Sequence, residues 1–183
     1  MAKPTPNDRI NLTKLTCLVI DDNALSLELI SQIMTAFGIG KLIQHRSAEA
    51  SMRVIMEQPV DLIITDGQMP GMDGYSFTRW VRGLEHAENR YAPILLLTGE
   101  TRASYITRGR DVGASLVVSK PINPQALLDR LFWVSLDERE FVESDFYSGP
   151  DRRFKVVKLE DGVADRREGE VVAKPERLLN TGS

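Results

Sequence analysis

Five short runs of β type alternate with longer stretches of helical period over the first three quarters of this chain. Such alternation is typical of β-α-β units, in which a helix joins each pair of parallel strands. We therefore expect an α/β fold with a five-stranded parallel sheet, doubly wound, covered by helices on both faces. The predicted strands are residues 15–20, 41–45, 60–65, 94–98 and 115–119.

The first predicted helix covers residues 23–37 and stops before Gly38, a residue type that commonly terminates helices. Apolar side chains at four-residue spacing indicate one buried face, formed by Leu25, Leu29, Ile33 and Phe37. Further helices are predicted over residues 47–58 and 125–136. The methionines that we expect to fill gaps in the core are Met34, Met52 and Met56.

Polar residues stand at the carboxyl ends of four of the predicted strands. Asp21 and Asp22 follow the first strand, Asp66 follows the third, Thr98 ends the fourth and Lys120 follows the fifth. In an open parallel sheet, this edge is where ligands bind. Three carboxylates crowded together repel one another, and a hard cation such as Mg²⁺ relieves that repulsion. The alternative is an acidic strand edge without such chemistry, which the presence of Thr98 and Lys120 disfavours.

Composition limits the classes of function. The chain has 183 residues, 42% of them hydrophobic, which suffices for one core with an appendage. Cys17 is the single cysteine, so no intramolecular disulfide forms, and no apolar stretch reaches membrane-spanning length. Residues 137–183 carry 9 Lys and Arg against 12 Asp and Glu, so DNA or RNA binding is disfavoured. We expect a cytoplasmic protein that does not insert into membranes.

The motifs at these strand ends resemble those of receiver domains of bacterial two-component signalling, the CheY-like family, over roughly residues 14–136. The matching segments are 18–23, 62–66 with 69–74, 97–99, and Gly113-Ala114 leading to Lys120-Pro121. The resemblance implies a flavodoxin-like fold and a signalling protein that is not an enzyme.

By the same resemblance, Asp66 accepts a phosphoryl group from a histidine kinase or phosphotransferase. Asp21, Asp22, Asp66 and the backbone carbonyl of Gln68 would organise Mg²⁺. Thr98 would hydrogen-bond the phosphoryl group and Lys120 would pair with it. These roles suit phosphoryl transfer, which needs an oxygen nucleophile, a divalent ion and cations around the phosphoryl oxygens.

The fifth predicted strand departs from the family pattern. Family members commonly carry Tyr or Phe three residues before the lysine, where this chain has Val117. That aromatic side chain usually swings inward as the threonine moves, whereas valine is short and stiff. The usual coupling between phosphorylation and the surface around this strand is therefore in doubt.

Residues 137–183 lack a long periodic segment, and we expect them to be disordered without a partner; residues 1–13 are predicted to be flexible. An Asp-Arg-Arg unit occurs at residues 151–153 and again at 165–167. Guanidinium groups can bond guanine O6 and N7, while a carboxylate accepts from the opposite edge of the base. Paired arginines also hold phosphates.

A receiver followed by an arginine-rich extension resembles the CheY-like cyclic di-GMP effectors called Cle proteins. That resemblance implies cyclic di-GMP as a ligand and a protein target such as the flagellar motor. The candidate contacts are Asp151, Arg152, Arg153, Asp165, Arg166 and Arg167, with Tyr147 and Phe154 as stacking neighbours. Two alternatives stay open. The extension is a solvated charged tail, or the protein is a conventional phospho-receiver whose tail docks on a partner.

Overall fold

The computed structural model describes residues 10–85 and 88–152, together with the backbone of residues 170–172. Its main sheet has five parallel strands in the order β2-β1-β3-β4-β5. These strands are β1 (Thr16–Ile20), β2 (Lys41–His45), β3 (Leu62–Asp66), β4 (Ile94–Thr98) and β5 (Leu116–Ser119). The prediction of a doubly wound, five-stranded parallel sheet is confirmed.

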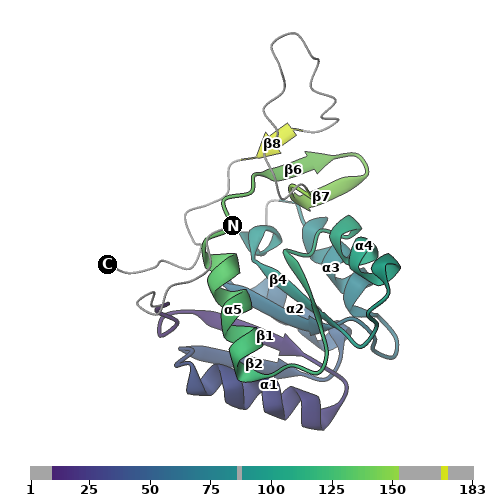
Figure 1. Ribbon diagram of the computed structural model, residues 1–183. Coiled ribbons are helices and arrows are strands. Elements are labelled where there is room, and N and C mark those ends of the chain that lie inside the picture. The colour runs from purple at the N-terminus through teal and green to yellow at the C-terminus, as the bar shows by residue number, and fades with distance from the viewer. Residues whose placement is uncertain (1–9, 86–87, 153–169, 173–183) are drawn as a thin grey trace.

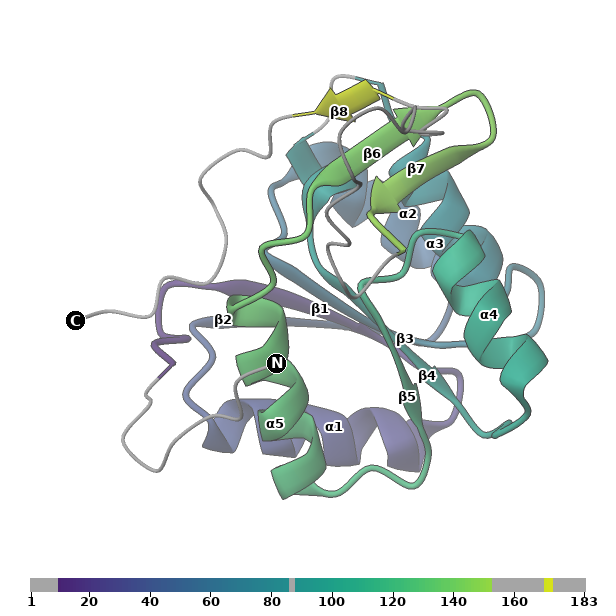
Figure 2. The same cartoon turned by 45° about the horizontal axis from the view of Figure 1, so that its top comes forward.

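Helices cover both faces of this sheet (Figure 2). They are α1 (Ala24–Ala36), α2 (Ala48–Glu57), α3 (Gly74–Arg82), α4 (Ala103–Asp111) and α5 (Pro124–Ser135), with a 3-10 turn η1 (Glu88–Tyr91) before β4. Side chains alternate along each strand, so Cys17 and Val19 pack toward α1 and α5, whereas Leu18 and Ile20 pack toward α2 and α3. Burial on both faces explains why the central strands β3 and β4 are mostly apolar, whereas the edge strand β2 contains Lys41, Gln44 and His45.

The predicted buried face of α1 is wrong in part. Leu25 and Leu29 are 82% and 49% exposed, whereas Ile33 is buried together with Leu27, Ile30 and Met34. The start of the helix determines which face is buried. Asn23 caps α1 by accepting hydrogen bonds from the backbone N–H groups of Leu25 and Ser26. In this orientation, the row that starts at Leu27 faces the sheet.

The prediction that three methionines fill gaps in the core is also correct only in part. Met34 is fully buried and Met52 is partly buried, whereas Met56 is 65% exposed and fills no gap in the core. Among the residues that the structure describes, no helix is both long enough and apolar enough to cross a membrane.

The segment after α5 contains regular structure that we did not predict. Strands β6 (Phe141–Ser144) and β7 (Tyr147–Pro150) form an antiparallel hairpin, and β8 (Glu170–Val172) pairs with the other edge of β6. The hairpin lies above α3 and α4 (Figure 1). The expectation of disorder therefore fails for residues 141–150; residues 153–169 and 173–183 lie outside the described part of the chain.

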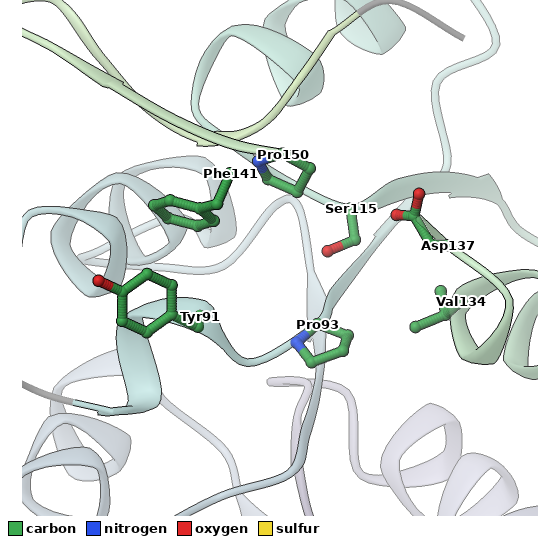
Figure 3. Close-up of a pocket in the computed structure, with 7 residues that line it drawn as sticks. All are labelled: Tyr91, Pro93, Ser115, Val134, Asp137, Phe141 and Pro150. Atoms are coloured by element: carbon green, nitrogen blue, oxygen red, sulfur yellow. The ribbon is translucent and has the colours of Figure 1, made fainter. Parts of the chain in front are cut away.

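Tertiary contacts with the rest of the chain stabilise the hairpin. Phe141 is 1% exposed, and its ring meets the Tyr91 ring edge-on at a centroid distance of 4.7 Å. Figure 3 shows these two rings at the seam between the hairpin and the main body, defined here as residues 10–136. The small pocket at this seam is lined by Tyr91, Pro93, Ser115, Val134, Asp137, Phe141 and Pro150.

Two buried arginines underlie the hairpin. Arg82 donates to the carbonyl oxygens of Gly113 and Ala92 at 2.9 and 2.8 Å, and also to that of Arg90. Its guanidinium carbon lies 5.7 Å from the Phe141 ring centroid. Arg90 pairs with Glu143 of β6 at 2.6 Å. The hairpin thus covers charges that would otherwise face solvent.

Candidate functional site

Three carboxylates meet at the carboxyl edge of the main sheet. The parallel pairing of β1 with β3 sets Ile20 opposite Thr65, so the aspartates that follow these residues become neighbours. Asp21, Asp22 and Asp66 each offer one oxygen, and these oxygens lie within 4.8 Å of one another. Asp21 is fully buried and Asp66 is 7% exposed. The sequence prediction that these three residues converge agrees with this geometry.

Lys120 joins the carboxylates from the end of β5. Its ammonium nitrogen lies 2.8 Å from Asp21 Oδ2 and 3.0 Å from Asp66 Oδ1. Burial lowers the pKa of Lys120, but hydrogen bonds to the two aspartates and their charges outweigh that effect and raise it overall. Lys120 is therefore a permanent cation beside Asp66 at neutral pH. One ammonium among three carboxylates leaves an excess of negative charge.

Burial raises the pKa of Asp66, and the hydrogen bond and charge of Lys120 partly offset this effect. The backbone N–H of Gln68 also hydrogen-bonds the Asp66 carboxyl, and this bond lowers the pKa. The predicted role of the Gln68 carbonyl as a metal ligand stays a prediction. The grouping of three carboxylate oxygens suits Mg²⁺, which takes hard oxygen ligands and keeps several waters.

Two residues that the sequence analysis missed hold the acidic pair in place. Ser26 donates to Asp21 Oδ2 at 2.5 Å from the first turn of α1. Arg46 donates twice to the backbone carbonyl of Asp22, at 2.8 and 3.2 Å. Ser26 lies within α1, away from any strand end, which was the signal that identified the other residues. Arg46 directly follows the predicted strand 41–45 and could have been found by that signal. These contacts fix Asp21 and the backbone of Asp22 at the sheet edge.

Thr98 ends β4 at the same edge of the sheet and is fully buried. Its hydroxyl oxygen accepts a hydrogen bond from the Glu100 backbone N–H at 3.0 Å and lies 3.4 Å from the Glu100 carbonyl. The backbone N–H of Lys120 donates to the Thr98 carbonyl at 2.7 Å, so β4 and β5 carry these two side chains together. The peptide bond between Lys120 and Pro121 is cis.

The hairpin of β6 and β7, to which Tyr147 belongs, lies at the opposite edge of the sheet (Figure 2). Arg152 stacks over the Tyr147 ring, with its guanidinium carbon 4.6 Å from the ring centroid, and pairs with Asp111 of α4 at 2.9 Å. The Asp151 N–H donates to the Glu140 carbonyl at 2.8 Å. The remaining candidates lie outside the described residues: Arg153, Phe154, Asp165, Arg166 and Arg167.

The Tyr147 side chain is less accessible than stacking on a nucleotide base would require. Its hydroxyl donates to the Pro150 carbonyl at 2.5 Å, and burial raises the pKa of Tyr147 to about 12. One ring face already carries Arg152. Tyr147 therefore forms part of a preassembled pair with Arg152.

Comparison with known proteins agrees with this geometry. Residues 17–132 match the family model of the response regulator receiver domain. A probable chemotaxis protein CheY of Rhizobium etli is 32% identical over 108 residues, which are 59% of this chain and 82% of that protein. The chain covers less than half of the length of several other curated relatives.

Solved structures share the fold. The chemotaxis response regulator CheY4 of Vibrio cholerae is 28% identical, with a TM-score of 0.60 over 65% of this chain and 97% of that one. The receiver domain of sensor histidine kinase PA1611 from Pseudomonas aeruginosa is 24% identical, with a TM-score of 0.57 over 62% and 91%. That structure has a magnesium ion coordinated in its active site cleft. From its fold and the match over residues 17–132, this chain belongs to the response regulator receiver domain family, as a signalling protein of the CheY type.

Proposed function

We propose that this protein is a phospho-receiver in which Asp66 accepts a phosphoryl group from a histidine kinase or phosphotransferase. The observation that carries the proposal is the shared contact of Lys120 with Asp21 and Asp66, beside the oxygen of Asp22. A carboxylate oxygen of Asp66 attacks phosphorus, an acyl phosphate forms, and the bond from phosphorus to the donor histidine nitrogen breaks. Such signalling would take place in the cytoplasm.

Each residue of the site has a distinct task in this reaction. Asp21, Asp22, Asp66 and the Gln68 carbonyl would hold Mg²⁺, which neutralises charge on the phosphoryl oxygens when bound. Lys120 transfers its contact from the carboxylates to a phosphoryl oxygen. The Thr98 hydroxyl donates a hydrogen bond to another phosphoryl oxygen. A solved structure of the same fold holds magnesium in its cleft, which supports Mg²⁺ as the ion for such a site.

Exposed leucines beside the pocket support a protein as phosphodonor. Leu25 and Leu29 lie one helical turn apart on α1, which begins directly after the acidic pair. Their side chains are apolar and open to solvent, in contrast to Leu27 on the buried side of the same helix. A helical donor domain that covered them would bring its phosphohistidine to Asp66.

The test is phosphoryl uptake from a small-molecule donor with Mg²⁺ present, measured as the mass of the intact protein. We expect uptake by the wild type, none by Asp66→Asn, and wild-type uptake by Asp129→Asn, which alters an exposed aspartate of α5. Uptake by Asp66→Asn equal to that of the wild type would refute the assignment of Asp66.

We also propose that the extension binds cyclic di-GMP, so that the protein acts as a second-messenger effector on a target such as the flagellar motor. The stack of Arg152 over Tyr147 favours this function, because a guanidinium held over an aromatic ring suits a planar base. The ion pair of Arg152 with Asp111 anchors the start of this first Asp-Arg-Arg unit to the main body, and the backbone bond of Asp151 ties it to Glu140.

Calorimetric titration of the full chain with cyclic di-GMP tests this second function, with GTP and cyclic di-AMP as controls. We expect Arg153→Ala or Arg167→Ala to weaken binding by about 1–3 kcal/mol, the scale of a lost bidentate guanine contact. Arg53→Ala, at an exposed position on α2, should leave affinity unchanged, and Asp66→Asn should still bind. Absence of binding, or wild-type affinity in both tail variants, would exclude the extension as the site.

A further inference from the structure

The hydroxyl of Tyr75 is buried without a hydrogen bond of ordinary geometry to any residue that the structure describes. Tyr75 is the second residue of α3 and is 1% exposed. Burial raises the pKa of this hydroxyl, and the nearby Thr98 side chain partly offsets that effect. A buried polar group without a partner costs free energy, so its retention calls for a functional explanation.

The Tyr75 ring lies between the backbone that follows Asp66 and helix α4. A Cβ built on Gly67 would lie 3.0 Å from Tyr75 Cε2, and one built on Gly109 would lie 3.8 Å from Cε1. The guanidinium carbon of Arg108 is 4.1 Å from the ring centroid. Arg108 also pairs with Asp73, the N-cap of α3, at 2.7 Å. Tyr75 therefore contacts both the phosphoryl-acceptor side and α4.

This arrangement accounts for the missing aromatic residue on β5. A Cβ on Gly109 would lie only 2.3 Å from Val117 Cγ2, so α4 approaches β5 closely and a larger side chain at residue 117 would find little space. Tyr75 shares a buried cluster with Leu96 of β4, and Val117 packs against that cluster. The aromatic ring near Thr98 thus comes from α3.

We propose that Tyr75 positions Thr98 and transmits its movement to α4; this inference rests on the phosphorylation of Asp66 proposed above. In the structure, the Thr98 hydroxyl accepts from the Glu100 backbone N–H, and among the described residues the Tyr75 hydroxyl has no hydrogen bond of ordinary geometry, although the Thr98 side chain lies near it. When Thr98 turns to donate to a phosphoryl oxygen, its own oxygen becomes free to accept from the Tyr75 hydroxyl. Phosphorylation thereby gives the buried Tyr75 hydroxyl a hydrogen-bond partner, and the movement of the Tyr75 ring shifts Arg108 and Gly109.

Helix α4 carries this movement toward the extension. It starts near the carboxyl edge of the sheet and ends beside the hairpin (Figure 2). Its last residue, Asp111, pairs with Arg152, and a Cβ on Gly113 would lie 2.4 Å from the Ser148 carbonyl oxygen. Gly109 is the one buried residue of α4, so few contacts hold the helix in place. Phosphorylation at Asp66 and binding at the extension are coupled through this helix.

The test follows backbone amide NMR signals of the full chain while Mg²⁺ and beryllofluoride, a stable substitute for the phosphoryl group, are added. We expect wild-type signals to shift at Asp66 and Thr98, in α4 and in the hairpin. In Tyr75→Phe, the Asp66 and Thr98 signals still shift, whereas the shifts in α4 and the hairpin fall at least twofold. Tyr105→Phe, which removes a hydroxyl from α4 itself, should respond like the wild type.

The outcomes separate the two proposals. Shifts in α4 of Tyr75→Phe equal to those of the wild type, with the pocket signals responding normally, would overturn the role of Tyr75 alone. Absence of any shift at Asp66 in the wild type would remove the phospho-receiver function and this inference with it. Tyr75→Phe keeps the ring and loses only an unpaired hydroxyl, so without beryllofluoride its unfolding midpoint should equal or exceed that of the wild type.

Discussion

Asp66 holds its proton more tightly in the folded chain than in the unfolded one, because burial raises its pKa above the ordinary value of 3.8. Its contribution to the free energy of unfolding is therefore fully present below that value and is lost as the pH rises through the raised pKa. We expect Asp66→Asn to unfold at higher urea concentration than the wild type at pH 7, with a chelator present. This advantage should shrink at pH 3, where both states of the wild type are protonated.

The control for this prediction is Asp129→Asn, whose exposed side chain should change stability by no more than about 0.5 kcal/mol at either pH. A pH-independent difference between Asp66→Asn and the wild type would mean that the charge on Asp66 is not what destabilises the fold.

Most of the acidic pocket could be predicted from the sequence, whereas the residues that support it could not. Asp66, Thr98 and Lys120 stand where apolar runs end, and parallel strands bring their carboxyl ends together. Ser26 and Tyr75 lie inside helices, where their contacts depend on how each helix is rotated about its axis. That rotation is set by caps and packing, which the apolar pattern alone did not resolve for α1.

Arg82 is a residue for which sequence reasoning would give the wrong environment, since an arginine in the last turn of a helix is usually solvated. Here it is 1% exposed and its planar guanidinium donates to three backbone carbonyls. Lysine cannot reproduce that geometry. We expect Arg82→Lys to lower the free energy of unfolding by roughly 2–4 kcal/mol, because charged hydrogen bonds are worth about 1.5–3 kcal/mol each.

Urea denaturation checks this value, and Arg79→Lys, at an exposed position on the same helix, is the matched control. Equal stability of the two variants would show that the charge at residue 82, and not the shape of the guanidinium, is what the site requires.

At the scale of elements, α4 is capped differently from its neighbours. Its N-cap is Arg102, which makes no side-chain capping bond, whereas Asn123 caps α5 by accepting from the Ala126 N–H at 2.7 Å. An aspartate at residue 102 can accept from the first-turn N–H groups and also favours the helix dipole. We expect Arg102→Asp to stabilise the protein by about 1 kcal/mol and Asn123→Ala to destabilise it by a similar amount.

Hydrogen exchange locates both effects, since Arg102→Asp should slow exchange in α4 and Asn123→Ala should speed it in α5. The exposed contact of Arg102 with Glu100 at 3.4 Å contributes little and does not reverse the sign. Faster exchange of α4 in Arg102→Asp would mean that the present cap is already favourable.

The hairpin marks the limit of prediction for elements. The main strands were recognisable as short β-type runs, which are mostly apolar in β3 and β4. In β6 and β7 the buried residues are Gly149, Pro150 and, with the largest side chain, Phe141. Its partners, Tyr91 and Arg90, are about fifty residues away in sequence. Such contacts form only in the folded main body, so no local sequence pattern predicts the strands that they hold.

For the whole molecule, the hairpin is part of the folded unit. A chain that ends at Leu136 loses the Phe141 ring, the Glu143 partner of Arg90 and the Ser148 hydroxyl that donates to the Arg82 carbonyl at 2.9 Å. A chain that ends at Arg152 keeps all three. Burial of a phenylalanine is worth about 1.5–3 kcal/mol, and an unpaired buried charge adds to the loss. We expect the shorter chain to be less stable by roughly 3 kcal/mol or more.

Urea unfolding of the two truncated chains measures this difference, with the full chain as reference. The chain ending at Arg152 should stay close to the full chain, because it keeps these three contacts, and the described contact that it loses is the pairing of β8 with β6. Equal midpoints for the chains ending at Leu136 and Arg152 would mean that the main body compensates Arg82 and Arg90 by itself. A large difference would mean that ligand-binding tests of the extension must retain the hairpin, since its removal would disturb the body to which the nucleotide site is anchored.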